Sequence, residues 1–230
     1  MSTAFRVVVI GGTGQVGGAV VRELLATTEC REIVMVTRKP IPTNDQARIR
    51  NVVMDTNAVD FQARVTDLAR EVVASGDRVA AVSCVGVGSG SNQWSEAQLK
   101  QLEVGVVGSF ARGIRAAGIT QFCLLSAVGS TSRSHIKYVR VMGLKEEAAQ
   151  AVNFPRLAIF RPGIIVGNVH TPTWMNWLGK LIPGPWGNID QRDIGKAFVA
   201  EVVKNGATNG VDYFDNQAMR RLILASGRND

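Results

Sequence analysis

The segment 11–18, GGTGQVGG, constrains the fold of this chain more than any other part of the sequence. It directly follows the apolar run 5–10, FRVVVI, which has the composition of a buried strand. It precedes a segment from about 15 to 26 whose apolar residues have helical spacing. A glycine-rich turn between a strand and a helix is typical of the start of a βαβ unit, so the sequence predicts such a unit here.

The glycines at positions 11, 14 and 17 have the spacing G-x-x-G-x-x-G. Gly11 permits a tight turn, Gly14 lets a ligand approach the backbone, and Gly17 lets the helix pack closely against the strand. The unpaired N–H groups and the dipole of a helix N-terminus attract an anion at that point. These features predict a site for the pyrophosphate of a dinucleotide. The alternative is a loop whose glycines serve close packing alone.

Short runs rich in β-branched residues recur along the chain and alternate with longer segments of helical spacing. The expected strands are 5–10, 32–37, 51–55, 78–85, 121–126, 156–161 and 210–215. Helices are expected over about 15–26, 95–117, 138–151 and 193–205, and after Asn216 as the N-cap of the last one. Because these strands are continuously apolar, they predict a mostly parallel, doubly wound α/β sheet of the Rossmann-like type, covered on both faces.

The length and composition favour one domain that spans residues 1–230, since 46% of its residues are hydrophobic and can bury a proper core. The segment 168–188 mixes Trp, Pro and Gly without a regular period, which indicates a small C-terminal cap over the carboxyl ends of the strands. Its part 173–182 could roof an apolar pocket, contact a membrane surface or a protein partner, or pack its tryptophans into the core.

The net charge of +7 is spread along the chain, with Lys and Arg not interleaved with aromatic residues. This pattern argues against nucleic-acid binding and favours a phosphate-rich ligand. No apolar run approaches the ~20 residues that a transmembrane helix needs, and no room for a signal or transit peptide is expected before the run 5–10. Cys30, Cys84 and Cys123 lie far apart and mostly in apolar runs, so we expect buried thiols and a cytoplasmic location.

The turn after the second expected strand favours NADP over NAD. An NAD-specific site usually has an acidic residue about 20 residues after the glycine loop, whereas this chain has Arg38 and Lys39 there. The Arg38 guanidinium can bind a 2′-phosphate bidentately and stack on adenine. The alternative is that both cations are ordinary solvated loop charges. Asp55, which ends the third expected strand, either accepts a hydrogen bond from the adenine amino group or caps the following turn.

Four parts of the sequence occur in an order that resembles the atypical short-chain dehydrogenase/reductases: 11–18, 124–130 (LLSAVGS), Tyr138 and 160–168 (FRPGIIVGN). The chain looks most like the small single-domain, NADP-binding group that includes the Tat-interacting oxidoreductase known as a metastasis suppressor. The resemblance implies that Ser126 hydrogen-bonds a substrate carbonyl. It also implies that Tyr138 passes a proton to or from the carbonyl oxygen.

The same resemblance implies where the nicotinamide half of the cofactor lies. Pro162 and Gly163 would lie along the nicotinamide, with the backbone of Ile164 or Ile165 available to its carboxamide. The turn with Val85 and Gly86 would border the ribose. The full set of expected cofactor-binding residues is Gly11, Thr13, Gly14, Gln15, Val16, Gly17, Arg38, Lys39, Asp55, Val85, Gly86, Pro162, Gly163 and Ile164.

The resemblance implies a lysine four residues after Tyr138, where this chain has Met142. Such a lysine would hold the nicotinamide ribose and lower the pKa of the tyrosine, which is near ~10 in a free phenol. Lys145 lies on the same helix face but roughly 10 Å further along the axis. Two interpretations of Met142 follow. In the first, Met142 packs in the core and Tyr138 has no catalytic role. In the second, Tyr138 stays a protonated phenol, which can still support carbonyl reduction.

Two functions remain open from the sequence. The first is an NADPH-dependent oxidoreductase that reduces a carbonyl on a small, partly apolar substrate. The second is a regulatory protein whose NADPH occupancy sets its contact with a protein partner, which Met142 favours. Metalloproteins and hydrolases lack the residues they need in this chain. His135 and His170 are the only histidines, and the cysteines lack zinc spacing, so no metal is expected. Ser126 is not within G-x-S-x-G, so a hydrolase is unsupported.

Overall fold

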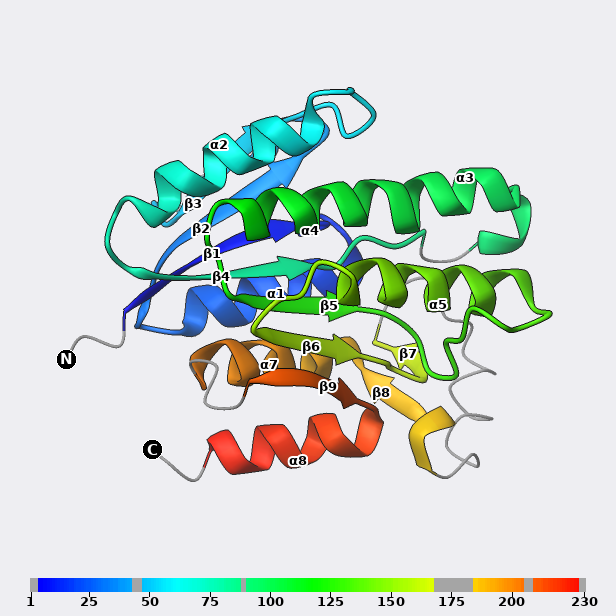
Figure 1. Cartoon of the computed structure of the whole chain (residues 1–230). Helices are drawn as coiled ribbons and strands as arrows, with labels where there is room; N and C mark the ends of the chain where they lie inside the picture. The colour runs from blue at the N-terminus through cyan, green and yellow to red at the C-terminus, as the bar shows by residue number, and fades with distance from the viewer. Residues whose placement is uncertain (1–3, 43–46, 88–89, 168–183, 205–208, 228–230) are drawn as a thin grey trace.

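The computed structural model describes residues 4–42, 47–87, 90–167, 184–204 and 209–227 of the chain. Its centre is a seven-stranded sheet in the order β3-β2-β1-β4-β5-β6-β9, and all neighbouring strands are parallel (Figure 1). The strands are β1 (Phe5–Ile10), β2 (Cys30–Thr37), β3 (Ile49–Val53), β4 (Arg78–Ser83), β5 (Gln121–Leu125), β6 (Arg156–Phe160) and β9 (Gly210–Phe214). The predicted doubly wound α/β fold is confirmed, and the strand order reverses between β1 and β4.

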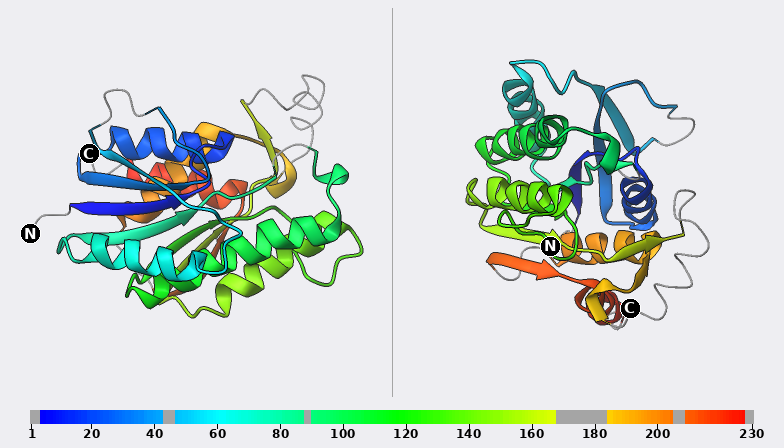
Figure 2. Two further views of the ribbon diagram at one scale, coloured as in Figure 1. Left: turned by 90° about the horizontal axis from the view of Figure 1, so that it is seen from above. Right: turned by 90° about the vertical axis from the view of Figure 1, so that its right-hand side faces the viewer.

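Helices cover both faces of the sheet (Figure 2). One face carries α2 (Phe61–Val73), α4 (Val107–Ala116) and α5 (Lys137–Gln150), and the other carries α1 (Gln15–Ala26), α7 (Gln191–Val203) and α8 (Asn216–Ser226). Successive strand residues point to opposite faces. Val7 and Val9 therefore belong to the hydrophobic core with α1 and α7, whereas Val8 and Ile10 belong to the core with α2 and α4.

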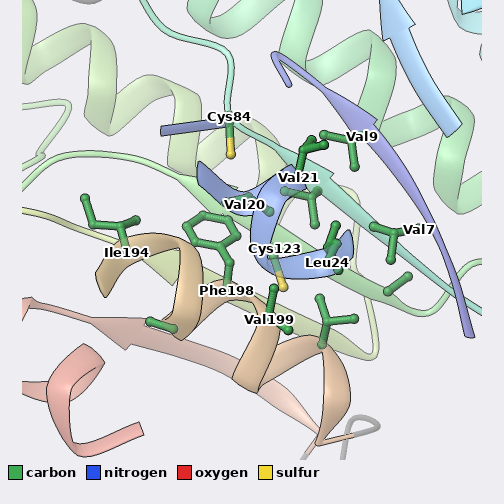
Figure 3. Close-up of a cluster of buried hydrophobic side chains, with 14 of the residues drawn as sticks. Val7, Val9, Val20, Val21, Leu24, Cys84, Cys123, Ile194, Phe198 and Val199 are labelled. Atoms are coloured by element: carbon green, nitrogen blue, oxygen red, sulfur yellow. The ribbon is translucent and has the colours of Figure 1, made fainter. Parts of the chain in front are cut away.

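The core under α1 and α7 contains all three cysteines. Figure 3 shows Leu24 of α1 and Phe198 of α7 in one cluster with Cys84 and Cys123. These two cysteines and Cys30 are buried and free, so the prediction of buried thiols is confirmed. Burial raises the pKa of Cys30 to about 11 and that of Cys84 to about 12. Both thiols therefore stay protonated at neutral pH and are poor nucleophiles.

The helix expected over 95–117 is confirmed, but it is not α-helical throughout. It consists of α3 (Glu96–Lys100), a π-helical segment η2 (Gln101–Val106), and α4. A capping box starts α3, with the Ser95 hydroxyl accepting the N–H of Gln98. In a π-helix each N–H bonds to the carbonyl five residues back rather than four. The apolar spacing predicted the helical segment but not this wider turn.

Two other elements differ from the sequence predictions. Helix α2 was not predicted, although Val65 and Val72 in it are buried at helical spacing. The N-cap of α8 is Asp215, whose Oδ1 accepts the N–H of Ala218 at 2.8 Å. The prediction of Asn216 as the N-cap is wrong, because Asn216 is fully buried and uses its side chain inside the protein.

Most of the predicted cap, including all of 173–182, lies outside the described residues. The part 184–188 forms a 3-10 turn η3 (Gly184–Trp186) and the start of β8 (Asn188–Asp190). Strand β8 pairs in parallel with β7 (Ile164–Val166), beside the main sheet (Figure 1). Within the described ranges, no helix is long and apolar enough to cross a bilayer.

Candidate functional site

A cavity of about 220 Å³ opens at the carboxyl ends of β1, β2 and β4. Residues that the sequence analysis assigned to the cofactor form part of its lining: Gly11, Thr13, Gly14, Arg38, Val85 and Gly86. The other lining residues were not predicted: Ile10, Val36, Thr37, Thr56, Cys84, Leu102 and Val106. The cavity lies where the strand order reverses, which is where doubly wound sheets bind their ligands.

The glycine loop makes close backbone contacts at two positions. Gly11 has a φ of +80°, and a Cβ there would lie 2.5 Å from the carbonyl carbon of Cys84. A Cβ on Gly17 would lie 2.1 Å from the carbonyl oxygen of Gly11, so α1 touches the turn at this point. Both positions therefore require glycine.

The N-terminus of α1 lies at the cavity wall. Gly14 is the N-cap and lines the cavity, and no described side chain caps this end of the helix. The first turn also has no acidic residue. Gln15 is exposed, whereas Val16 and Gly17 are buried and support the loop from behind. The N–H groups of the first turn and the helix dipole therefore remain available to an anion.

Arg38 lines the cavity. Its side chain is exposed and makes no hydrogen bond or ion pair with any residue in the described ranges. The turn that carries it is fixed by Thr37, whose hydroxyl accepts a hydrogen bond from Asn51 Nδ2 at 2.6 Å and donates one to the Lys39 carbonyl at 2.7 Å. The side chain of Lys39 is exposed and does not line the cavity.

Asp55 caps a turn, which was one of its two expected roles. Its Oδ1 accepts the N–H of Asn57 at 2.9 Å, and it does not line the cavity. The next residue, Thr56, does line it.

Ser126 belongs to a buried polar network at the end of β5. Its hydroxyl donates to Glu146 Oε1 at 2.5 Å and lies 3.2 Å from the hydroxyl of Ser130. Glu146 is held in turn by Arg161, whose Nε donates to the same Oε1 at 2.9 Å. The Arg161 guanidinium lies 4.2 Å from the centre of the Tyr213 ring. The hydroxyl hydrogen expected to bind a carbonyl is therefore directed at Glu146, which sequence reasoning did not identify.

Tyr138 lies at the start of α5 and is partly buried. It packs against a small hydrophobic cluster that contains Leu99, Val141 and Met142. Met142 is 2% exposed, so its side chain is core packing. Burial and the negative charge of Glu103 raise the pKa of Tyr138 above that of a free phenol, so it stays protonated at neutral pH.

A buried ion pair that the sequence analysis missed lies between α5 and η2. Lys145 Nζ is 2.8 Å from Glu103 Oε2 and donates to the Val85 carbonyl at 2.8 Å. Glu103 Oε1 accepts the N–H of Val87 at 3.1 Å. The exposed fractions of the two charged side chains are 1% and 0%. Both therefore hold the turn that follows β4, which forms one wall of the cavity.

The turn after β6 is fixed by Asn216. Its Oδ1 accepts the N–H of Gly163 at 3.0 Å, and its Nδ2 donates to the Gly187 carbonyl at 2.7 Å. Pro162 accepts the N–H of Val128 through its carbonyl at 2.9 Å. The N–H of Ile164 bonds to the Gly187 carbonyl, so this N–H is not available to a carboxamide. Ser126, Tyr138 and this turn all lie outside the cavity lining.

Comparison with known proteins identifies relatives in fungi. No family model matches the sequence. The mitochondrial protein fmp52 of Aspergillus clavatus is 30% identical over 167 residues, which cover 70% of this chain and 67% of that protein. The mitochondrial protein FMP52-1 of Scheffersomyces stipitis is 28% identical over 163 residues, which cover 71% of this chain and 68% of that protein.

Solved structures share the fold at low sequence identity. UDP-glucose 4-epimerase from Brucella ovis in complex with NAD superposes with a TM-score of 0.68 at 16% identity, over 98% of this chain and 82% of that one. WbmH of Bordetella bronchiseptica in complex with NAD+ has a TM-score of 0.67 at 13% identity, over 96% and 79%. The oxidoreductase ylbE of Lactococcus lactis has a TM-score of 0.62 at 16% identity, over 95% and 97%.

These comparisons correct one prediction and establish the relationship. The cytoplasmic location expected from the sequence is wrong, because the fungal relatives are named as mitochondrial proteins. With a relative at 30% identity over two thirds of its length, and with the glycine loop and parallel sheet described above, the chain belongs to the FMP52 protein family and has the Rossmann-like fold of the atypical short-chain dehydrogenase/reductases.

Proposed function

We propose that this chain is an NADP(H)-dependent oxidoreductase of the atypical short-chain dehydrogenase/reductase type, which reduces a carbonyl on a small, partly apolar substrate. The observation that carries the proposal is the cavity in which the glycine loop meets Arg38. The NAD complexes of the Brucella and Bordetella enzymes support it, because their fold is similar. We also propose a mitochondrial location, which the names of the fungal relatives support.

The residues of the cavity fit a dinucleotide. The N-terminus of α1 has no side-chain cap and can bind the pyrophosphate, and the glycines leave room for it. Arg38 has no partner in the described part of the chain and can bind a 2′-phosphate. These two positive features both border one cavity, and NADP carries a pyrophosphate and a 2′-phosphate for them to bind.

Replacing Arg38 by alanine should weaken the binding of NADPH much more than that of NADH. Charge-assisted hydrogen bonds contribute about 1.5–3 kcal/mol, so we expect the Kd of NADPH to rise about ten- to a hundredfold. The Kd of NADH should change little, because NADH lacks the 2′-phosphate. Calorimetric titration of the two cofactors measures both values.

Lys39→Ala is the matched control for Arg38→Ala. Lys39 is also an exposed cation, one residue further on, but it does not line the cavity. We expect Lys39→Ala to leave the preference for NADPH in place. Equal losses of NADPH and NADH affinity in Arg38→Ala would contradict the assignment of the 2′-phosphate site.

When bound, NADPH would supply the hydride. Tyr138 would donate its proton to the carbonyl oxygen, since burial and Glu103 raise its pKa and keep the phenol protonated. Ser126 would have to turn its hydroxyl hydrogen away from Glu146 in order to bind the same oxygen. This arrangement favours reduction over dehydrogenation, because a phenol that resists ionisation is a poor base.

Tyr138→Phe should lower the rate of carbonyl reduction by about a hundredfold or more, which is the usual contribution of a general acid. The affinity for NADPH should be unchanged. Oxidation of NADPH, followed by its absorbance across a set of aldehydes and ketones, measures the rate. The wild-type rate should show no ionisation of Tyr138 between about pH 6 and pH 9, because its pKa is raised above the ordinary value. An unchanged rate in Tyr138→Phe would exclude it as the proton donor.

A second candidate function is an NADPH-binding regulatory protein that acts through a protein partner. The buried Met142 and the Ser126 hydroxyl bound to Glu146 favour it, since neither prepares a site for catalysis. A protein that binds NADPH but reduces none of the carbonyl compounds supplied would favour this function over the first.

A further inference from the structure

We propose that Lys145 and Glu103 form a positioning pair for the cofactor site, so that this chain carries its supporting cation seven residues after Tyr138 instead of four. The pair holds the turn 85–87 against the cavity and sets the electrostatic environment of the Tyr138 hydroxyl. The inference rests on the proposed function, because it assigns residues that support the same site.

The pair is attached to the cavity wall at two points. Lys145 donates to the Val85 carbonyl at 2.8 Å, and Glu103 accepts the N–H of Val87 at 3.1 Å. Val85 and Gly86 line the cavity. Removing two charges from water is costly, and a buried ion pair is weak evidence for stability alone. Here both charged groups form hydrogen bonds with the backbone of one turn, so their burial serves to hold that turn in place at the site.

The helix that carries Glu103 is widened at this residue. Glu103 lies in the π-helical segment η2, and such segments are frequent at functional sites. Its neighbours in η2, Leu102 and Val106, line the cavity, while Glu103 itself is fully buried against Lys145. The same six-residue segment therefore supplies part of the cavity wall and also the carboxylate that holds the turn 85–87, another part of the lining.

The other cations of α5 have partners away from the cavity. Lys137 Nζ donates to the Trp94 carbonyl at 2.6 Å, and Arg140 pairs with Glu96 at 2.8 Å. Both are partly exposed, and they tie the start of α5 to the residues before and within α3. Lys145 is thus the cation of α5 that is buried beside the cavity wall.

The ionisation of Tyr138 can be used to detect the charge of Glu103. It packs on the same cluster as Met142, and the carboxylate of Glu103 opposes its ionisation. The chain contains only two tyrosines, Tyr138 and Tyr213. In a Tyr213→Phe parent, which keeps the ring under Arg161, all phenolate absorbance therefore comes from Tyr138.

The test compares this parent with the double variant Lys145→Met/Glu103→Gln. The double variant removes both charges together and leaves no buried charge unpaired, so it should melt within a few degrees of the parent. We expect its Kd for NADPH to rise about tenfold or more, because the Val85 carbonyl loses its donor and the side chain at position 103 loses the ion pair that holds it against the turn. We also expect its phenolate absorbance to begin at a lower pH, because the carboxylate that opposes the ionisation of Tyr138 is gone.

Lys100→Met is the matched control, since Lys100 also pairs with a glutamate but on the exposed side of α3. It should change neither quantity. A folded double variant that keeps the parent's NADPH affinity would overturn the positioning role. If the parent itself binds neither NADPH nor NADH, the proposed function fails, and the phenolate titration alone then tests the inference. Phenolate absorbance that begins at a lower pH in the double variant supports the pair. Phenolate absorbance that begins at the same pH as in the parent overturns it.

Discussion

Gly17→Ala should lower the free energy of unfolding by about 3 kcal/mol or more, because the added methyl group overlaps backbone that cannot move aside. Its Cβ would lie 2.1 Å from the carbonyl oxygen of Gly11 and 2.9 Å from the Cα of Gly12. Gly11 is itself in close contact with the backbone of Cys84, so the turn cannot move toward Cys84 to make room for the methyl group. The turn would have to move into the cavity, and NADPH binding should be lost together with stability.

Urea unfolding followed by far-ultraviolet circular dichroism measures this loss. Gly18→Ala is the matched control, because it adds the same methyl group one residue later in the same helix. There the nearest atom outside the helix backbone lies at 3.6 Å, at the end of the Arg22 side chain. Alanine is a better helix former than glycine, so stability should rise by up to about 1 kcal/mol. A Gly17→Ala protein with the urea midpoint of the wild type would contradict the packing argument.

The fold could be predicted because its signals are local. The glycine loop, the apolar strands and the helical spacing each lie within a dozen residues, and the parallel order of the strands follows from their continuous apolar character. The same local signals brought Gly11, Gly14 and Arg38 to one cavity, since the turns after parallel strands meet at one edge of the sheet.

The polar contacts of the site could not be predicted, because they depend on how distant segments pack. Glu103 and Lys145 are 42 residues apart in the chain, and each alone has the sequence pattern of a surface residue on a helix. Asn216 has the residue type of an N-cap, but a one-residue shift of the helix start makes Asp215 the cap. That shift turns Asn216 inward, where it bonds to Gly163 and Gly187.

Another buried charged network lies at the opposite end of the sheet from the cavity. Arg156, the first residue of β6, places its Nε 2.6 Å from Glu201 Oε1 and its Nη1 2.7 Å from Asp212 Oδ2. Arg156 and Glu201 are buried, whereas the Asp212 side chain is 55% exposed. The backbone carbonyl of Glu201 also accepts the side-chain N–H of Gln121 at 2.9 Å. This network joins α7 to the amino ends of the strands.

Arg156→Met should lower the free energy of unfolding by about 3–5 kcal/mol, because it leaves the carboxylate of Glu201 buried without its counterion. Asp212→Asn removes the outer partner of the same arginine. It should cost at most about 1 kcal/mol, since water screens an exposed ion pair. Urea unfolding measures both losses, and equal losses in the two variants would contradict the role of burial.

The double variant Arg156→Met/Glu201→Met distinguishes a lost ion pair from lost packing. Apolar side chains of similar volume can replace a buried ion pair at little cost, so most of the stability should return. The coupling energy from the double-mutant cycle should then be large and favourable. If the two losses simply add, the cost of Arg156→Met comes from packing and not from the unpaired charge. Because β6 begins at the end of the sheet opposite the cavity, the folded double variant should bind NADPH with the affinity of the wild type. That result would separate the charges that hold the sheet together from those that shape the site.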